Sequence, residues 1–260
     1  MKACEIIEAL FNLAEERDYS KSCDKCVSGN PEVNVKKAAV TMFASPDVIK
    51  EAKKWGAELL IVHEPVFHSS KDETDELDNL KRKLIEDSGI TLYRYHDHTH
   101  YTVPDIIAEG EFKYLGLDGK MECTNVFDLV RLYPEKPITP RELAILFQER
   151  LGIKHVRICG VTDEECTCIS GMFGAPGDNA LAEMKRPETQ IVVVGETREW
   201  LLCEYTRDAA QLGLKKSLLV LGHAGSERDG MKHTADILSD MFPDVEFKYF
   251  ECGEVYTYTD

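Results

Sequence analysis

The sequence predicts an α/β protein with mixed, mostly parallel sheets. Short apolar runs alternate with amphipathic helical segments, and parallel neighbouring strands need such crossover connections. Two strand–helix–strand segments resemble each other: AAVTMFASP leads through a helix to LLIVHEP, and IVVVGETREW leads through a helix to LLVLGHAG. A histidine follows the second strand of each segment, His63 in one and His223 in the other. Because ligands collect beyond the carboxyl ends of parallel strands, both histidines lie where a functional site is expected.

The first part of the chain has clear helix boundaries. Ser45 is a typical N-cap, Pro46 suits the first helical position and Gly56 suits the end of the helix. The run LLIV is apolar throughout, as expected of a central parallel strand. The expected elements are a helix at 6–14, a strand at 35–43, a helix at 46–56, a strand at 59–62, a helix at 72–88 and a strand from 91 into the histidines at 96–100.

The second part continues the alternation. Ile138 and the pair Thr139 and Glu142 form a hydrophobic staple and a capping box at a helix start. The expected elements are strands at 125–132, 156–161, 166–172, 190–195, 217–221 and 245–250, and helices at 139–151, 199–212 and 226–241. The change of pattern predicts a first α/β half at 1–122 and a second at 123–260, with the last helix and strand able to pack on the first half.

Composition restricts the possible function. Acidic residues (47) outnumber basic ones (31), which gives a formal net charge of -16 for the 260 residues. Such a surface repels phosphodiester backbones and anionic lipids, so we expect neither nucleic-acid nor membrane binding. No apolar run approaches the roughly 18 residues of a membrane span, and the first residues lack the continuous apolar stretch of a signal peptide. A cytoplasmic protein is expected.

The nine cysteines form an odd set, which fits free thiols in a reducing compartment. Two pairs allow a further role, Cys23 with Cys26 and Cys166 with Cys168. A zinc site would need a second pair at suitable spacing, and a redox site would need a thioredoxin-like βαβ context. Neither context surrounds residue 23, so an ordinary loop is the favoured interpretation.

Histidines and carboxylates gather in three short segments. His63 and Glu64 precede a proline that ends the strand, so both side chains can turn toward one ion. In an extended chain His96, His98 and His100 would share one face, which favours metal ligation over a purely structural role. The third segment has His223 and Glu227 four residues apart at a strand-to-helix corner, where Ser226 can cap the helix. Glu196 occupies the corresponding corner of the neighbouring strand.

Nitrogen and oxygen ligands in this number suit one or two transition-metal ions, with Zn, Fe, Mn and Ni not distinguished. Two ions about 3.5–4 Å apart would polarise an oxygen and generate hydroxide between them. Structural alternatives exist for each segment taken alone. A single histidine at a strand end is more often a hydrogen-bonded structural residue, and Glu227 would also complement a helix dipole.

At these segments the chain resembles the NIF-three-like (NGG-interacting-factor-three-like) family, also described as dinuclear metal centre hexameric proteins. Its bacterial members carry the description type 2 GTP cyclohydrolase I. The family's His-His-Pro, His-Thr-Asn-Leu-Asp, Gly-Glu and Gly-His-Tyr-x-x-Glu motifs correspond here to VHEP, HDHTH, VGE and GHAGSE, in the same order. The resemblance implies two similar α/β halves, a metal pair in the cleft between them and a homohexamer.

Two positions depart from the family pattern. Glu64 replaces the second motif histidine, and His100 replaces the motif aspartate when His96 leads the motif. The alternative register, with His98 leading, would place Thr102 at the aspartate position and remove a ligand. With His96 leading the motif, the ligand inventory is unchanged, with three imidazoles and two carboxylates: His63, Glu64, His100, His223 and Glu227. His96 and His98 are further ligands or supporting groups.

The leading hypothesis is a dinuclear, metal-dependent hydrolase of the GTP cyclohydrolase type 2 kind. Two divalent metal ions would bind each chain, and Glu227 or Glu196 would carry the proton. A nucleotide or another small molecule would be the substrate. The competing hypothesis is a metal-containing hexameric scaffold or regulatory protein without turnover. A phosphoesterase with an HxH strand motif is weaker, because such enzymes usually place that motif near the amino terminus.

Overall fold

The computed structural model describes residues 1–68, 75–123 and 129–259. The chain forms two compact units: unit 1 takes Met1–Ile106 together with Met231–Asp260, and unit 2 takes Ile107–Gly230. The predicted boundary between residues 122 and 123 therefore falls inside unit 2. The last helix and strand belong to unit 1, because the final strand completes the sheet of that unit.

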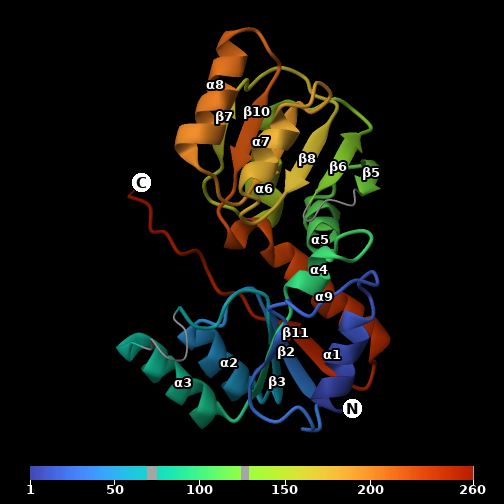
Figure 1. Ribbon diagram of the computed structural model, residues 1–260, viewed down its shortest axis with the longest axis vertical. Helices are drawn as coiled ribbons and strands as arrows, with labels where there is room; N and C mark the ends of the chain where they lie inside the picture. Colours follow the sequence, from blue (N-terminus) through green and yellow to red (C-terminus); the bar gives the residue numbers. More distant parts are fainter. Residues whose placement is uncertain (69–74, 124–128, 260) are drawn as a thin grey trace. The chain divides into compact units, whose positions relative to one another are not determined.

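Unit 1 contains a five-stranded sheet in the order β1-β4-β3-β2-β11, of which Figure 1 labels β3, β2 and β11. Its strands are β1 (Lys25–Ser28), β2 (Lys37–Thr41), β3 (Leu59–Val62), β4 (Thr91–Arg94) and β11 (Glu246–Tyr249). Four of them are parallel, and β1 pairs antiparallel with β4 at the edge. β1 was not predicted from the sequence, because this strand is short, polar and partly exposed.

The helices of unit 1 cover its sheet. They are α1 (Ala3–Phe11), α2 (Pro46–Trp55), α3 (Glu76–Ser88), the single turn α4 (Asp97–His100) and α9 (Arg228–Met241), whose residues from Met231 onward belong to this unit. The predicted caps of α2 are present: the Ser45 hydroxyl accepts a hydrogen bond from the Val48 amide, and Gly56 has a φ of +90°. Val48, Ile85 and other apolar side chains of α2 and α3 pack on one face of the sheet. Residues 72–74 of the predicted α3 lie outside the described residues.

Unit 2 contains a six-stranded sheet in the order β5-β6-β8-β9-β10-β7. Its strands are β5 (Gly119–Cys123), β6 (Val130–Pro134), β7 (Arg157–Gly160), β8 (Ile169–Met172), β9 (Ile191–Val194) and β10 (Ser217–Val220). The three central strands β8, β9 and β10 are parallel, and the remaining pairings are antiparallel. The first half of the predicted strand at 125–132 lies outside the described residues, because 124–128 are not described.

The helical segments of unit 2 are α5 (Ile106–Leu115), α6 (Pro140–Leu151), α7 (Asp178–Met184), the π-helical turn η1 (Glu199–Cys203), α8 (Glu204–Gln211) and the 3-10 turn η2 (Ala224–Ser226). The predicted capping box of α6 is present, with reciprocal hydrogen bonds between Thr139 and Glu142. Leu202 and Met184 join the apolar side chains of β9 and β10 in a buried core. This core fixes the carboxyl ends of β9 and β10.

A buried ion pair supports the sheet of unit 2. Arg131 on β6 donates two hydrogen bonds of 2.8 Å to the carboxylate of Glu183 on α7. The hydroxyls of Ser170 and Thr189 donate to the same carboxylate at 2.7 Å. Burial works to raise the pKa of Glu183, but these donors outweigh it and hold the pKa at about 2.

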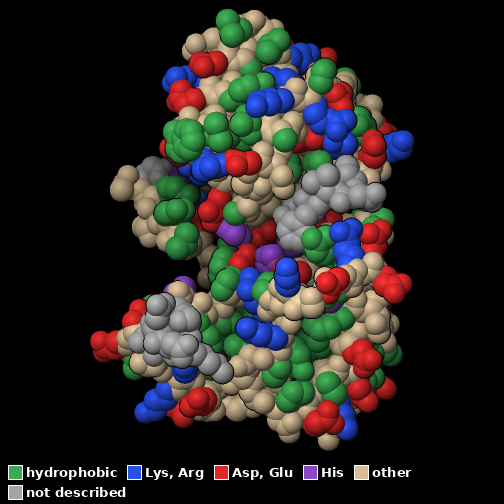
Figure 2. All heavy atoms as spheres, viewed as in Figure 1, with side chains coloured by type: hydrophobic (Ala, Val, Ile, Leu, Met, Phe, Trp, Pro, Cys, Tyr) green, Lys and Arg blue, Asp and Glu red, His purple; other side chains and the backbone are tan. Residues whose placement is uncertain are grey.

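The surface is strongly charged. On the face drawn in Figure 2, acidic and basic side chains are interspersed over each unit. Among the described residues, no helix is both long enough and apolar enough to cross a membrane.

Candidate metal centre

The histidine-rich segment is not an extension of β4. β4 ends at Arg94, and Asp97–His100 forms one helical turn, so the predicted strand through 96–100 is wrong. Helical residues four apart share a face, whereas residues two apart do not. His96 and His100 consequently point together, and His98 points away from them.

His98 lies between two aromatic rings. Its ring centroid is 4.0 Å from that of Phe11 and 3.8 Å from that of Tyr19, and both rings are nearly parallel to it. Its Nδ1 atom contacts Asp24 Oδ2 at 2.6 Å. His98 belongs to none of the potential metal-binding groups found among the described residues. The geometry therefore gives His98 a packing role and separates it from the other two histidines of the motif.

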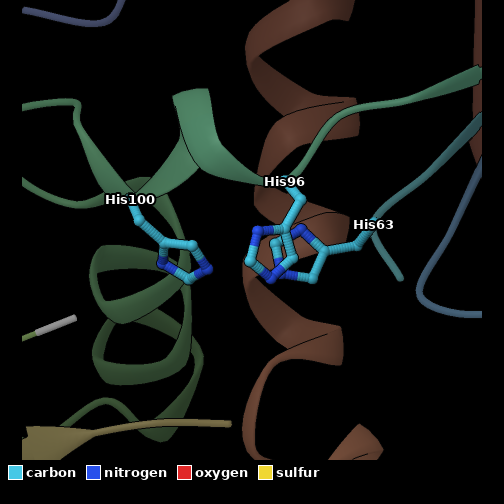
Figure 3. Close-up of side chains that lie close together, drawn as sticks. All are labelled: His63, His96 and His100. Carbon is cyan, nitrogen blue, oxygen red and sulfur yellow. The ribbon is translucent and has the colours of Figure 1, made fainter. Parts of the chain in front are cut away.

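Three histidines of unit 1 converge. His63 follows β3, and His96 and His100 come from the helical turn after β4 (Figure 3). The ring centroids are 4.5 Å apart for His63 and His96, 5.2 Å for His63 and His100, and 5.0 Å for His96 and His100. One potential ligand nitrogen of each ring lies within 4.8 Å of the others. These three residues form the three-histidine cluster.

Hydrogen bonds fix how two of these rings present their nitrogens. His63 Nδ1 lies 3.1 Å from the carbonyl oxygen of Tyr95, and because a carbonyl only accepts, Nδ1 carries the proton. His100 Nδ1 lies 3.0 Å from the buried Asp105 Oδ2. The lone pair that remains for a metal is then on Nε2. Metal-binding histidines in proteins usually have their second ring nitrogen held by a carbonyl or carboxylate in this way.

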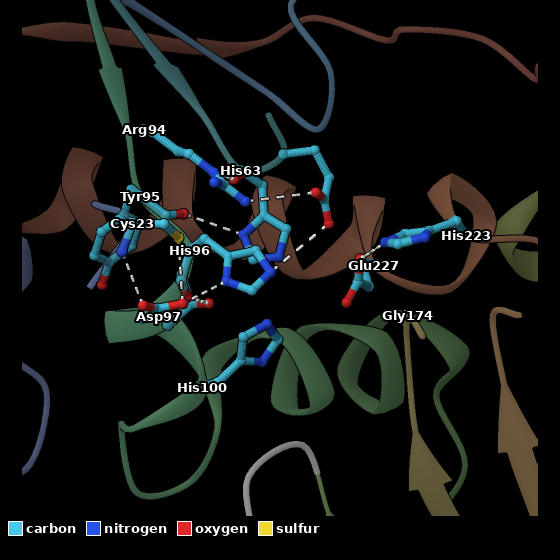
Figure 4. Close-up of polar contacts among 12 residues, drawn as sticks. Cys23, His63, Arg94, Tyr95, His96, Asp97, His100, Gly174, His223 and Glu227 are labelled. Carbon is cyan, nitrogen blue, oxygen red and sulfur yellow. Dashed lines mark hydrogen bonds and ion pairs between the residues drawn. The ribbon is translucent and has the colours of Figure 1, made fainter. Parts of the chain in front are cut away.

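His96 has an equivalent carboxylate partner that also holds a thiol (Figure 4). His96 Nδ1 lies 2.9 Å from Asp97 Oδ1, and the Cys23 thiol donates to the same oxygen at 3.3 Å. Burial opposes ionisation of Asp97, but hydrogen bonds from His96 and Cys23 lower its pKa to about 2. Burial, together with Asp24 and Asp97, raises the pKa of Cys23 to about 12 against the opposing effect of Arg94. A thiol held neutral in this way is a poor nucleophile.

Asp24 organises the histidine loop. Its Oδ1 atom accepts hydrogen bonds from the amides of His96 and Asp97 at 2.6 and 3.1 Å, and its Oδ2 atom accepts the His98 amide at 2.9 Å. The side chain is fully buried. Although burial works to raise the pKa of Asp24, these hydrogen bonds and that of the His98 ring lower it. The helical turn is therefore held by a residue 72 positions earlier in the chain.

Glu64 lies beside the three-histidine cluster and is 7% exposed. Its Oε1 atom is 3.7 Å from His96 Nε2, and its Oε2 atom is 3.7 Å from a guanidinium nitrogen of Arg94. Arg94 also donates a 3.2 Å hydrogen bond to the His63 carbonyl. Arg94 thus compensates the charge of a carboxylate that the family motif does not have.

Unit 2 carries a second cluster at the carboxyl ends of β9 and β10. His223 Nδ1 lies 2.7 Å from Glu196 Oε1, and His223 Nε2 lies 3.1 Å from Glu227 Oε2 (Figure 4 draws the second contact). Glu227 is 2% exposed, whereas the side chain of Glu196 is 60% exposed. The Nε2 to Oε2 separation is close to that of two ligands on one ion.

Glycines allow this corner to close. Gly174 has a φ of +67°, and a Cβ atom there would lie 2.3 Å from Glu227 Oε1. At Gly195, a Cβ atom would lie 2.4 Å from Ser226 Oγ. The Ser226 hydroxyl donates to the His223 carbonyl and accepts from the Gly174 amide, both at 2.9 Å. Ser226 therefore ties the corner together instead of capping the helix as predicted, because α9 begins at Arg228.

The structure groups most of the predicted site residues by unit. His63, Glu64, His96 and His100 gather in unit 1, and Glu196, His223 and Glu227 gather in unit 2. The residues that support these ligands were not predicted from the sequence: Asp24, Arg94, Tyr95, Asp97 and Asp105. Two of them could have been found from their spacing, because Asp97 directly follows His96 and Asp105 comes five positions after His100.

All nine cysteines lie in the described residues, and no disulfide bond joins any two of them. Cys166 is buried and donates to the Glu164 carbonyl at 3.3 Å, and burial raises its pKa to about 11. Cys168 is also buried, and burial raises its pKa. This pair behaves as small core side chains, whereas Cys23 lies beside the three-histidine cluster.

Fold and site together define an α/β protein with a candidate metal-ligand cluster beyond the strand ends of each unit. The family model for Duf34/NIF3 (NGG1p interacting factor 3) matches residues 1–254, so the chain belongs to the Duf34/NIF3 family. This confirms the family that the motifs indicated.

Relatives agree with this assignment. The GTP cyclohydrolase 1 type 2 homolog of Clostridium perfringens is 26% identical over 234 residues, which cover 84% of each chain. The Bacillus cereus protein related to NIF3 superposes with a TM-score of 0.78 at 14% identity, covering 100% of this chain and 99% of that one. Reduced HcgD from Methanocaldococcus jannaschii gives a TM-score of 0.74 at 18% identity, covering 96% and 97%. At these identities the two solved structures establish the fold.

Proposed function

We propose that the chain is a divalent-metal-dependent hydrolase of small molecules. One observation carries the proposal: His63, His96, His100 and His223 each present Nδ1 to a carbonyl or carboxylate. When Nδ1 carries the proton toward such a partner, Nε2 offers its lone pair to a metal, which is the arrangement typical of metal-binding histidines.

The chain's own donors suit borderline divalent ions. Unit 1 offers the imidazoles of the three-histidine cluster with the Glu64 carboxylate, and unit 2 offers His223 with Glu227. Imidazole nitrogen and carboxylate oxygen in this mixture fit Zn, Fe, Mn or Ni. We assign two ions per chain, as the family motifs imply.

Such ions supply Lewis-acid polarisation and activate water for hydrolysis. Glu227 is a ligand in this proposal, because it is buried and held against His223 Nε2. Glu196 is assigned proton transfer, because its exposed carboxylate contacts His223 Nδ1 and can exchange protons with solvent. Arg94 pairs with Glu64, whose other carboxylate oxygen lies 3.7 Å from His96 Nε2.

The substrate class is proposed from the Clostridium relative, whose name is GTP cyclohydrolase 1 type 2 homolog. GTP and other nucleoside triphosphates are therefore the first substrates to assay. Metal-dependent turnover is expected in the wild type. Glu196→Gln is expected to retain metal and lose most of the turnover, because the amide keeps the size of the side chain but cannot accept a proton.

Metal content per chain tests the proposal directly. Protein purified without chelators is expected to hold about two ions, and His63→Ala and His223→Ala are each expected to lower that number. His68→Ala is the matched control, because His68 is exposed and lies outside the cluster. Full metal content in both cluster variants would refute the proposal. Metal binding without turnover of any substrate would favour the scaffold hypothesis.

We further infer self-association, which the family resemblance implies as a homohexamer. Large apolar side chains are exposed on unit 2, among them Trp200 (70%) and Leu212 (81%), as expected of a surface that another copy covers. Sedimentation velocity of the wild type and of Trp200→Glu measures the assembly. A monomeric wild type would refute this inference.

A further inference from the structure

We propose that Cys23, Asp97 and the Nδ1 atom of His96 form a second, thiolate-containing site in unit 1 for a borderline or soft divalent cation such as Zn²⁺. This cysteine site extends the proposed function and rests on it only through the shared His96. The family motifs do not include Cys23, which lies in the loop before β1.

The three donor atoms surround one point. Cys23 Sγ and His96 Nδ1 lie 3.3 and 2.9 Å from the same oxygen, Asp97 Oδ1, and one potential ligand atom of each residue lies within 4.8 Å of the others. Ligands on a tetrahedral zinc ion, with bonds of about 2.0–2.3 Å, are separated by about 3.5 Å. Small side-chain rotations therefore suffice to place an ion among them. Asp97 Oδ1 changes from a hydrogen-bond acceptor to a ligand.

The backbone around the cysteine site is already fixed. The Cys23 amide donates to Asp97 Oδ2 at 3.0 Å, so the carboxylate is anchored from the side opposite its proposed ligand atom. The next residue, Asp24, accepts the amides of His96 and Asp97. The loop that carries the thiol and the loop that carries the imidazole are thus joined by three hydrogen bonds from backbone amides to side-chain carboxylates. A preorganised pair of loops loses little conformational freedom when an ion binds.

His96 connects the cysteine site to the three-histidine cluster. A neutral imidazole has one lone pair, so His96 serves one group of ligands at a time. With the proton on Nδ1 toward Asp97, Nε2 can serve the three-histidine cluster. With the proton on Nε2 toward Glu64, 3.7 Å away, Nδ1 can bind an ion in the cysteine site. Cys23 releases its thiol proton to solvent when the ion binds.

Cys26 offers a matched comparison within the same CxxC motif. It lies in β1 opposite Tyr93 of β4, and its thiol contacts the Ser28 carbonyl at 3.5 Å. Like Cys23 it is partly buried, but it belongs to none of the potential metal-binding groups among the described residues. The motif therefore contributes one ligand and not a pair. This resolves the alternatives that the sequence left open for residues 23 and 26 in favour of a mixed S, N, O site.

Cobalt substitution tests the cysteine site, because Co²⁺ bound to a thiolate absorbs in the near ultraviolet by sulfur-to-metal charge transfer. Titrating metal-free protein with Co²⁺ is expected to produce this absorption in the wild type and in Cys26→Ser. Cys23→Ser is expected to lose it, because the serine hydroxyl supplies no sulfur ligand. Circular dichroism and thermal melting of all three proteins verify that they are folded.

The outcomes separate this inference from the proposed function. A wild type that binds Co²⁺ without the charge-transfer absorption would overturn the cysteine site and leave the hydrolase proposal intact. Absorption that persists in Cys23→Ser would also overturn it. Asp97→Asn is a second variant that keeps the thiol. It is expected to bind Co²⁺ at least tenfold more weakly, so that the charge-transfer absorption at a given Co²⁺ concentration falls with the fraction of sites occupied. Unchanged Co²⁺ affinity and absorption in Asp97→Asn would contradict the assigned ligand set.

Discussion

Substituting Gly174 by alanine tests the position of Glu227 without removing a ligand. A Cβ atom at residue 174 would lie 2.3 Å from Glu227 Oε1 and 2.8 Å from its carboxyl carbon. Ordinary contacts require about 3.5 Å, so the carboxylate must retreat by roughly 1 Å. A metal–oxygen bond tolerates a displacement of only about 0.2 Å. We therefore expect Gly174→Ala to lower metal affinity by about 10–100-fold, as loss of a supporting group does.

Backbone strain also contributes, and it has to be separated from the displacement of Glu227. Gly174 has a φ of +67°, where alanine costs about 1–2 kcal/mol of unfolding free energy. Gly177 lies in the same loop with a φ of +61°, and nothing lies within 4 Å of a Cβ atom there. Gly177→Ala should lose at least as much unfolding free energy in thermal or urea denaturation, because Gly177 combines its positive φ with a ψ of -131°, but it should retain its metal affinity.

Metal affinity is measured by competition with a chelator of known strength, for both variants and the wild type. Equal losses of affinity in the two variants would show that strain in the loop matters and that Glu227 does not hold the ion. Wild-type affinity in Gly174→Ala would contradict the assignment of Glu227 as a ligand.

Three further predictions concern stability. The pKa of Glu183 is held at about 2, below its ordinary 4.5, so the ionised carboxylate stabilises the fold above pH 4.5 and this stabilisation is lost as the pH falls toward 2. The unfolding free energy, measured as a function of pH, should fall by about 3 kcal/mol over this range, and Glu183→Gln should lack this part of the pH dependence. Asp24→Asn should lower the unfolding free energy by about 2 kcal/mol in urea denaturation, because the NH₂ group of the new side chain would face the backbone N–H of His98. An unchanged urea midpoint would contradict the role of Asp24 in holding the histidine loop. Metal at about 100 times its dissociation constant should raise the unfolding free energy by about 2.7 kcal/mol, measured with and without chelator, and His63→Ala should show a smaller increase.

Several elements could be predicted from the sequence because their signals are local. The limits of α2 follow from Ser45 and Gly56, and the start of α6 follows from the Thr139 and Glu142 capping box. The apolar runs of β3, β9 and β10 were equally clear, since parallel strands buried on both faces have no polar positions. The positions of His63 and His223 beyond two of these strands follow from the same runs.

The histidine-rich segment shows where local signals fail. Alternation over residues 96–100 is compatible with a strand, but the backbone turns into a helix because Asp24 accepts three consecutive amides there. That hydrogen bonding depends on β1, a short and polar strand that pairs antiparallel with β4. No residue near the histidines indicates either the pairing of β1 with β4 or the hydrogen bonds from Asp24.

The amino-acid sequence by itself determined the α/β alternation, the family and the histidines and carboxylates available for a metal, because apolar periodicity, caps and motif order are properties of neighbouring residues. Tertiary structure decided which of these ligands converge. It grouped His96 with His100 and set His98 between aromatic rings. It also brought Cys23 to Asp97, across 74 positions of the chain. Side-chain direction depends on the backbone conformation and on partners distant in the sequence, and folding alone supplies both.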